Sequence, residues 1–207
     1  MKSRDLDKVY GAKTKDESRA AYNGWSASYD AENIAKGFRL PALCAGLLAR
    51  HLGRENGPIL DAGCGTGLVG ETLAILGYGP ITGCDLSPGM MARAAQTGAY
   101  ADFAEADMGT ALPFADGHFA GFTCVGAFGP GHAPPATLRH LVRVTRPGGV
   151  GVFNVVEATW RDQGFPQMME QLTDDGLWRV EQVTEPFRAY LLAEPEVATR
   201  AFAVRIL

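Results

Sequence analysis

Alternating glycines follow a short apolar segment that contains one aspartate, over residues 59–67 with the sequence ILDAGCGTG. Glycine permits positive φ angles and lets a ligand approach the backbone closely. The helix expected after the glycines adds free N–H groups and a partial positive charge at its N-terminus. These residue types at this spacing predict a loop whose backbone holds a ligand.

Two interpretations of this loop are open from the residues alone. Residues 65–70 match the pattern G-x-G-x-x-G, and Asp85 ends the next predicted strand. That combination is typical of NAD-dependent oxidoreductases. However, Asp61 would lie beside a pyrophosphate and repel it, whereas its carboxylate would stabilise a cationic ligand. The Asp-x-Gly-x-Gly-x-Gly series over 61–67 suits a nucleoside that carries an amino-acid tail and a positive charge.

His132 is the polar candidate for acid–base chemistry. It follows the fourth predicted strand, on the side where a substrate would enter. A histidine there can accept a proton from a hydroxyl or amine, or hydrogen-bond the substrate. The structural alternative is a loop histidine held by backbone groups.

The cysteines predict no metal site. None of them forms a CxxC pair, and no histidine lies at metal-ligand spacing from them. We therefore expect reduced thiols that pack as small apolar residues. The chain has four: Cys44, Cys64, Cys84 and Cys124.

Alternating strands and helices must position these residues. Strands are predicted over 58–62, 81–85, 102–106, 119–125 and 150–156, and helices over 42–52, 67–76, 88–96 and 134–145. Such alternation with short connections indicates a parallel sheet covered by helices on both faces. The earlier stretch 16–38 is helical in composition and forms one helix or two, because Gly24 and Ser26 weaken its middle.

The C-terminal part departs from this alternation. A helix over 164–174 precedes strands over 177–184 and 197–206, with no obvious helix between the two strands. Strands joined in this way favour an antiparallel pair. The predicted fold is α/β, with a Rossmann-like, doubly wound, seven-stranded sheet that is mostly parallel and has an antiparallel C-terminal strand pair.

Four motifs in order resemble those of class I S-adenosylmethionine-dependent methyltransferases. Residues 61–67 are similar to the first motif of that family, and Asp85 is similar to the acid that holds the ribose hydroxyls. Residues 105–108 resemble the stretch whose aspartate binds the adenine amino group, and 146–149 the turn before the fifth strand. The resemblance covers about Tyr22 to the C-terminus.

Two further stretches narrow the resemblance. Residues 22–30 are similar to a Tyr-Asp-x-Trp-Ala-x-x-Tyr-Asp stretch of small methyltransferases, although Asn23 and Ser26 replace its first Asp and its Ala. Residues 125–134 resemble the Williams–Beuren syndrome critical-region methyltransferase group in particular.

The resemblance implies S-adenosylmethionine as cofactor and S-adenosylhomocysteine as product. Asp107 would bind adenine, Leu86 and Met108 would pack on the purine, and Tyr29 would bond the carboxylate end of the cofactor. Asp61 would either contact the cofactor or brace the glycine loop. The full set of implied cofactor-binding residues is Tyr29, Asp61, Gly63, Cys64, Gly65, Gly67, Asp85, Leu86, Asp107, Met108, Cys124 and Val125.

Three aromatic residues recur at helical spacing before this domain. Tyr22, Trp25 and Tyr29 are spaced i, i+3 and i+7. Either they form the buried stripe of an amphipathic helix, or they belong to a lid whose rings surround the sulfonium or the substrate. The predicted division is an N-terminal arm and helical lid over 1–40, followed by a methyltransferase domain over 41–207.

Composition limits the function classes. The chain has 207 residues, a net charge of −4 and 46% hydrophobic residues, which suits one domain with a short appendage. The negative charge argues against a general basic surface for nucleic acid. No apolar run reaches the roughly 18 residues of a membrane span, and no secretory signal precedes the fold, so a cytoplasmic monomer or homodimer is expected.

The predicted activity is in-line methyl transfer from a sulfonium to a small-molecule acceptor, which needs positioning and water exclusion rather than a metal. Residues 126–129 read GAFG, where amino-methylating DNA enzymes would carry Asn/Asp-Pro-Pro-Tyr. An NAD-dependent oxidoreductase is one alternative, although no Tyr-x-x-x-Lys is present. A non-catalytic S-adenosylmethionine-binding module that acts with a partner is the other.

Overall fold

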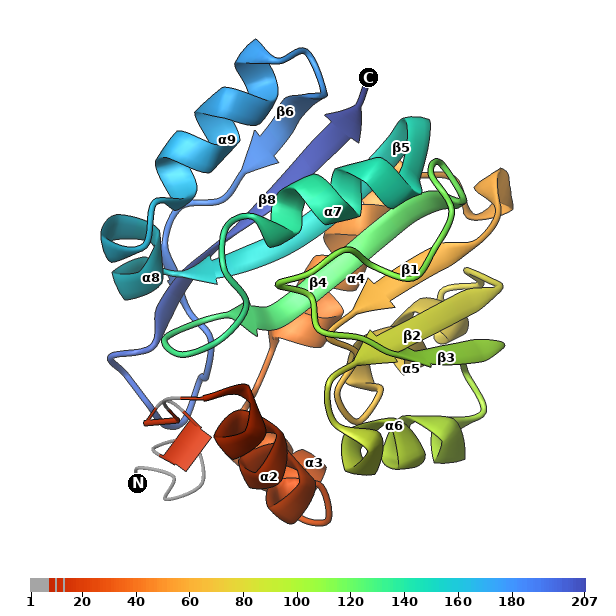
Figure 1. The fold of residues 1–207 in the computed structure, drawn as a ribbon. Coiled ribbons are helices and arrows are strands. Elements are labelled where there is room, and N and C mark those ends of the chain that lie inside the picture. The colour runs from red at the N-terminus through yellow and green to blue at the C-terminus, as the bar shows by residue number, and fades with distance from the viewer. Residues whose placement is uncertain (1–7, 10, 13) are drawn as a thin grey trace.

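One mixed sheet forms the centre of the protein (Figure 1). The computed structural model describes residues 8–9, 11–12 and 14–207. The strand order is β3-β2-β1-β4-β5-β8-β6, and the short β7 pairs with β8. The strands are β1 (Ile59–Ala62), β2 (Ile81–Asp85), β3 (Asp102–Glu105), β4 (Phe119–Phe128), β5 (Thr145–Val156), β6 (Trp178–Val183), β7 (Phe187–Arg188) and β8 (Ala198–Ile206).

The pairing confirms the predicted fold class. β1 to β5 pair in parallel, whereas β8 is antiparallel to β5, β6 and β7. The chain order reverses between β1 and β4, where a doubly wound sheet places its ligand crevice. The sheet also contains β7, a two-residue strand that the sequence pattern did not indicate.

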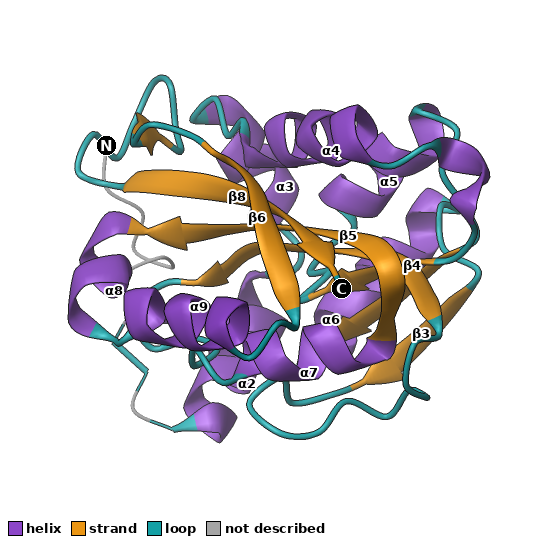
Figure 2. Cartoon of the chain, turned by 90° about the horizontal axis from the view of Figure 1, so that it is seen from above, coloured by secondary structure: helices purple, strands orange, loops and turns teal. Residues whose placement is uncertain are grey.

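Helices cover both faces of the sheet (Figure 2). α4 and α5 pack on one face with Leu48, Leu73 and Ile59 in their core, and α7 and α9 pack on the other with Leu141 and Phe165. The helices are α2 (Lys15–Trp25), α3 (Tyr29–Ala35), α4 (Leu40–His51), α5 (Leu68–Ile75), α6 (Pro88–Ala94), α7 (Thr137–Val144), α8 (Glu157–Asp162) and α9 (Phe165–Asp174), with short 3-10 turns at Arg54–Asn56 and Ala95–Thr97.

Several boundaries differ from the sequence pattern. The stretch 16–38 forms two helices, α2 and α3, as the weak middle allowed. α7 begins at Thr137 rather than at 134, because the residue before a proline is driven away from helical backbone angles and Pro134 and Pro135 stand together. β5 already begins at Thr145, before the expected turn at 146–149, and α8 was not predicted.

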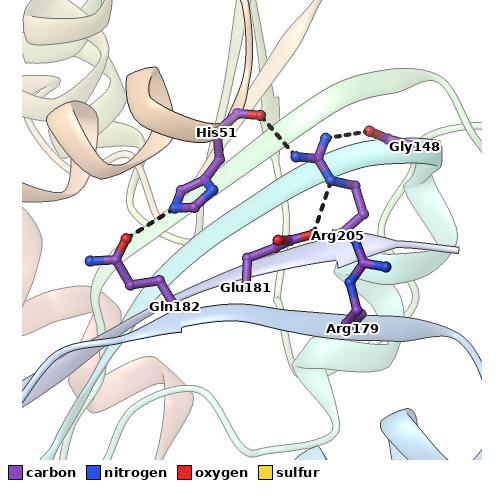
Figure 3. Close-up of polar contacts among 6 residues, drawn as sticks. All are labelled: His51, Gly148, Arg179, Glu181, Gln182 and Arg205. Atoms are coloured by element: carbon purple, nitrogen blue, oxygen red, sulfur yellow. Dashed lines mark hydrogen bonds and ion pairs between the residues drawn. The ribbon is translucent and has the colours of Figure 1, made fainter.

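Arg205 on β8 connects three elements at the base of the sheet (Figure 3). Its guanidinium donates to the carbonyl oxygens of Gly148 and His51, each at 3.0 Å, and its Nε lies 3.4 Å from Glu181 on β6. The His51 ring in turn lies 3.1 Å from the Gln182 side chain. These contacts fix the antiparallel strands against the end of α4.

The expected reduced thiols are confirmed. Cys44, Cys64, Cys84 and Cys124 are free and buried. Burial raises the pKa of each thiol well above its ordinary value, so none is a reactive thiolate. Among the helices of the described residues, none combines the length and the apolar character needed to cross a bilayer. The expected arm at the N-terminus lies largely outside the described residues.

Candidate functional site

A cavity of about 340 Å³ lies at the carboxyl ends of β1 to β4. α2 closes it from the side opposite the strands, and Figure 1 shows α2 in dark red beyond the arrowheads of β1 and β4. The lining residues come from the start of the chain and from the loops after four strands: Ala12, Thr14, Lys15, Ser18, Arg19, Tyr22, Tyr29, Gly63, Gly65, Asp85, Leu86, Ser87, Met90, Ala106, Asp107, Met108, Val125, Gly126, Ala127, Gly131, His132, Ala133 and Pro134.

The glycine loop after β1 forms one wall of this cavity. The backbone N–H groups of Gly63 and Cys64 both donate to the Cys84 carbonyl, at 2.8 and 3.0 Å, which turns the chain sharply away from β2. Gly65 has φ +54°, and a Cβ there would meet no atom within 4 Å. The backbone of this residue is therefore open to a ligand, and the left-handed angle favours glycine.

Asp85 ends β2 and lines the cavity. Oδ2 accepts the Gly65 N–H at 2.9 Å and Oδ1 accepts the Ser87 N–H at 2.8 Å. Burial raises the pKa of this carboxyl above its ordinary value, and the backbone N–H groups oppose the rise. Because each carboxylate oxygen has a second lone pair, Asp85 can still accept two hydroxyl groups from a ligand.

Asp107 follows β3 on the same side of the cavity. Oδ1 accepts the Gly109 N–H at 2.8 Å, and Oδ2 accepts from the Lys15 ammonium of α2. Partial burial alone would raise the pKa of Asp107, but the Lys15 and Gly109 hydrogen bonds outweigh it and lower the pKa. A single carboxylate thus joins α2 to the strand ends.

His132 and Tyr22 meet across the cavity. The Nδ1 atom of His132 lies 2.7 Å from the Pro130 carbonyl oxygen, and its Nε2 is bonded to the Tyr22 hydroxyl. A carbonyl oxygen only accepts, so Nδ1 carries the proton and Nε2 accepts from Tyr22. Burial lowers the pKa of His132, so the imidazole is neutral near pH 7 and has a basic Nε2.

Asp61 lies beneath the glycine loop rather than in the cavity lining. Its oxygens accept the Tyr100 hydroxyl at 2.7 Å and the Thr123 hydroxyl at 2.8 Å. Burial raises the pKa of Asp61 to about 6. Of the two roles expected for this aspartate, the contacts are those of a brace, although its partners are side chains and not loop N–H groups.

Tyr100 also explains the glycine that completes the dinucleotide pattern. A Cβ at Gly70 would lie 2.2 Å from the Tyr100 ring, so the helix must carry glycine there to let Tyr100 reach Asp61. Nothing in the local sequence around Tyr100 indicated this role. Tyr100 lies between a predicted helix and a predicted strand, where no motif or spacing points to a contact with Asp61.

We call α2 and α3 together (residues 15–35) the cover. Asn23 Oδ1 accepts the Ser87 hydroxyl at 2.6 Å and the Gly89 N–H at 2.9 Å, at the start of α6. Asp30 accepts the Thr66 hydroxyl in the glycine loop. Arg19 lies 3.7 Å from Glu105. The cover therefore rests on the same turns that carry the sequence motifs.

Most of the predicted site residues converge on this cavity. Ten line it: Tyr22, Tyr29, Gly63, Gly65, Asp85, Leu86, Asp107, Met108, Val125 and His132. Five others do not: Trp25, Asp61, Cys64, Gly67 and Cys124. Cys64 and Cys124 are buried in the core side of the sheet, and Gly67 packs against α6, where its Cβ would lie 3.0 Å from the Ala94 Cα atom. The roles of these five residues stay predictions.

Comparison with known proteins agrees with this geometry. Residues 59–149 match the methyltransferase domain family. The chain is 35% identical over 135 residues to methyltransferase-like protein 27 of Homo sapiens, which covers 62% of this chain and 54% of that protein. It is 36% identical over 124 residues to demethylmenaquinone methyltransferase of Beutenbergia cavernae, which covers 58% of this chain and 50% of that protein. The chain thus spans about half the length of these relatives.

The fold is also that of a solved methyltransferase structure. The TehB-like SAM-dependent methyltransferase of Corynebacterium glutamicum superposes with a TM-score of 0.67 at 18% identity, over 91% of this chain and 99% of that chain. Residues 59–149 thus carry a methyltransferase domain, and the motifs around the cavity and the fold agree with a domain of the class I, S-adenosylmethionine-dependent kind.

Proposed function

We propose that this protein transfers a methyl group from S-adenosylmethionine to a small-molecule acceptor by in-line displacement. The observation that carries the proposal is the cavity at the carboxyl ends of β1 to β4, where Asp85 and Asp107 line one space beneath the cover. Cofactor and acceptor must both fit under α2, which supports a small acceptor over a macromolecule.

Asp85 is the proposed ribose partner. The two lone pairs left after its bonds to the Gly65 and Ser87 N–H groups match the two hydroxyls of a ribose diol. The open backbone at Gly65 lets the nucleoside approach, and Gly63 continues the same wall. The division of the chain into a cover within 1–40 and a cofactor-binding domain over 41–207 follows from these roles.

The remaining contacts follow the cavity lining. Asp107 would accept the adenine amino group in competition with Lys15, and Leu86 and Met108 would pack on the purine. Val125, at the end of β4, would lie beside the methyl donor. Tyr29 would bond the carboxylate end of the cofactor.

His132 is the proposed general base. When bound, S-adenosylmethionine would supply an electrophilic methyl group and a thioether leaving group to an acceptor hydroxyl, which would give up its proton. S-adenosylhomocysteine is the product. The hydroxyl proton passes to Nε2 of His132 through the Tyr22 hydroxyl, since Nε2 already accepts from Tyr22, and leaves from the imidazolium to water.

Calorimetric titration with S-adenosylmethionine, S-adenosylhomocysteine and NAD tests the cofactor assignment. We expect the first two to bind and the Asp85→Ala variant to bind them at least about ten-fold more weakly, because hydrogen bonds to a charged group contribute roughly 1.5–3 kcal/mol. Asp174→Ala, at the exposed end of α9, is the matched control and should bind as the wild type does. Binding of NAD alone would overturn the proposal. Cofactor binding without turnover on any acceptor would favour the non-catalytic alternative.

A further inference from the structure

The pairing between β4 and β5 is interrupted where β4 reaches the cavity. Between its regular pairs at Cys124 and at Phe128, β4 places three residues opposite the single Asn154 of β5. We call these three residues, 125–127, the bulge. All of them line the cavity, and bulges beside active sites commonly serve to aim a side chain. A group that holds the bulge therefore also shapes the cavity wall.

The side chain of Asn154 supplies a hydrogen bond where the regular pairing is interrupted. Its Oδ1 accepts the Gly126 N–H, in the middle of the bulge, at 2.7 Å. Gly126 has φ +74°, a left-handed angle that favours glycine. The amide thus holds the chain at the residue where the backbone bends.

Thr199 on β8 fixes the orientation of this amide. The Asn154 Nδ2 donates to the Thr199 hydroxyl oxygen at 2.9 Å, and the same hydroxyl donates to the Val155 carbonyl oxygen at 2.7 Å. Because the hydroxyl proton is used by the carbonyl, the hydroxyl oxygen accepts from the amide, and Oδ1 must face Gly126. Asn154 is 1% exposed and Thr199 is fully buried, so water does not compete for these bonds.

The bulge is in turn bonded to the loop that carries His132. The Ala127 carbonyl oxygen accepts the Ala133 N–H at 3.2 Å, one residue after the histidine. The bulge also approaches the glycine loop, since a Cβ at Gly63 would lie 3.1 Å from the Ala127 Cβ. A movement of the bulge would therefore reach both the proposed base and the wall proposed to bind the cofactor.

We propose that Asn154 is a positioning residue for methyl transfer: its amide holds the bulge, and the bulge holds His132 beside the Tyr22 hydroxyl. The inference rests on the proposed function, because it takes His132 as the base. Asn154 does not line the cavity, so it acts through Gly126 and not on a ligand. Through the bond to Thr199, β8 also supports the site, although it lies outside the sequence motifs.

NMR titration of the His132 imidazole tests the inference without cofactor or acceptor. In the wild type, burial lowers the pKa of His132 below its ordinary value of 6.5, and a His132→Gln variant identifies its signal. In Asn154→Ala the Gly126 N–H loses its acceptor, so the bulge moves and water reaches the imidazole. We expect the pKa of His132 to rise toward 6.5 in this variant, because burial no longer disfavours the charged form as strongly.

Two further variants separate positioning from stability. Thr199→Val keeps Asn154 but removes the oxygen that accepts from its amide, so the pKa of His132 should rise by less than in Asn154→Ala. Thr145→Val, at the other end of β5, is the matched control, since it removes a buried hydrogen bond from Thr145 to the Leu141 carbonyl oxygen at 2.8 Å. It should lower the free energy of unfolding and leave the pKa of His132 unchanged.

Calorimetric titration with S-adenosylhomocysteine gives a second readout. Asn154→Ala should bind it more weakly, by up to about five-fold, the equivalent of one neutral hydrogen bond, because the bulge no longer packs firmly beside Gly63. Thr145→Val should bind it as the wild type does.

The outcomes separate the two proposals. The wild-type pKa of His132 in Asn154→Ala overturns the inference, and so does an equal rise in Thr145→Val. If Asn154→Ala does not fold, Thr199→Val decides in the same way: a rise supports the inference and an unchanged pKa overturns it. Failure of S-adenosylhomocysteine to bind the wild type contradicts the proposed function instead, and the His132 titration still measures whether Asn154 holds the bulge.

Discussion

The strand ends and the cover bound the same cavity but are held in different ways. At the strand ends, Asp61 and Asp85 are bonded by buried side chains or by backbone N–H groups. The cover is joined to them by side-chain pairs such as Lys15–Asp107, in which the Lys15 side chain is 65% exposed. Buried hydrogen bonds to charge contribute more than exposed ion pairs. We therefore expect the strand ends to form a fixed half of the site and the cover a half that can open.

The largest expected effect concerns the fixed half. Burial raises the pKa of Asp61 from 3.8 to about 6. A carboxyl whose pKa is raised on folding contributes stability that is full below its unfolded pKa and is lost as the pH rises through the folded value. Asp61→Asn removes the titrating group, so between pH 4 and pH 7.5 the wild type should lose about 2.4 kcal/mol more free energy of unfolding than the variant does.

Urea unfolding at a series of pH values measures this difference. Asp175→Asn, in an exposed ion pair on the surface with Arg139, is the control and should leave the pH profile of the wild type unchanged. If the free energy of unfolding changed with pH in the same way for the wild type and Asp61→Asn, the buried carboxylate would be stabilised as well in the folded protein as in water. The difference in stability between the fixed half and the cover would then be smaller than we expect.

A smaller effect is expected where the cover rests on α6. Asn23→Ala removes the acceptor for the Ser87 hydroxyl and the Gly89 N–H, at a cost of about 1 kcal/mol. Amide hydrogen exchange in α2 should become about five-fold faster while global unfolding changes little. Asn23→Asp keeps both acceptor bonds and should keep the protection. The free energy of opening of α2 follows from its exchange rate. If Asn23→Ala lowers the free energy of global unfolding by as much as it lowers this opening free energy, the cover is part of the fixed half.

The smallest effect is expected from Lys15→Ala. An exposed ion pair contributes between roughly zero and 1 kcal/mol, so the free energy of unfolding should barely change. The affinity for S-adenosylmethionine should rise by up to about five-fold, because Asp107 no longer has to release the ammonium before it binds adenine. Arg139→Ala breaks an exposed pair with Asp175 far from the strand ends and should change neither quantity. Weaker cofactor binding in Lys15→Ala would mean that Lys15 contacts the cofactor itself.

The sequence predicted the fixed half better than the cover. Gly63 and Gly65 belong to one turn directly after β1, and Asp85 ends the neighbouring parallel strand β2. Their positions relative to the predicted strand ends therefore carry the geometry.

Tyr100 and Thr123 lie far from Asp61 along the chain. The pairing of β4 with β1 brings Thr123 beside Asp61, and Tyr100 reaches it by packing against Gly70 of α5. The sequence therefore left the role of Asp61 open between cofactor contact and brace.

The contacts of the cover were harder to predict from the sequence for the same reason. Tyr22, Trp25 and Tyr29 have helical spacing, which predicts a common face but not what that face meets. The structure separates them, since Tyr22 and Tyr29 line the cavity at the strand ends and Trp25 does not. Asp30 ended the recognised stretch 22–30 but received no role from it. Lys15 showed no pattern, because exposed charges at helix ends are common and their partners depend on tertiary structure.

The position of β8 between β5 and β6 has a consequence for how the protein is made. During translation, β1 to β5, α8, α9 and β6 are made before β8, the strand that pairs with both β5 and β6 in the sheet. Until residues 198–206 emerge from the ribosome, β5 exposes a row of unpaired N–H and C=O groups, and such an edge is prone to pair with other chains. The nascent chain is therefore most vulnerable to aggregation between the synthesis of β5 and that of β8, when the strands from β1 to β5 are already made.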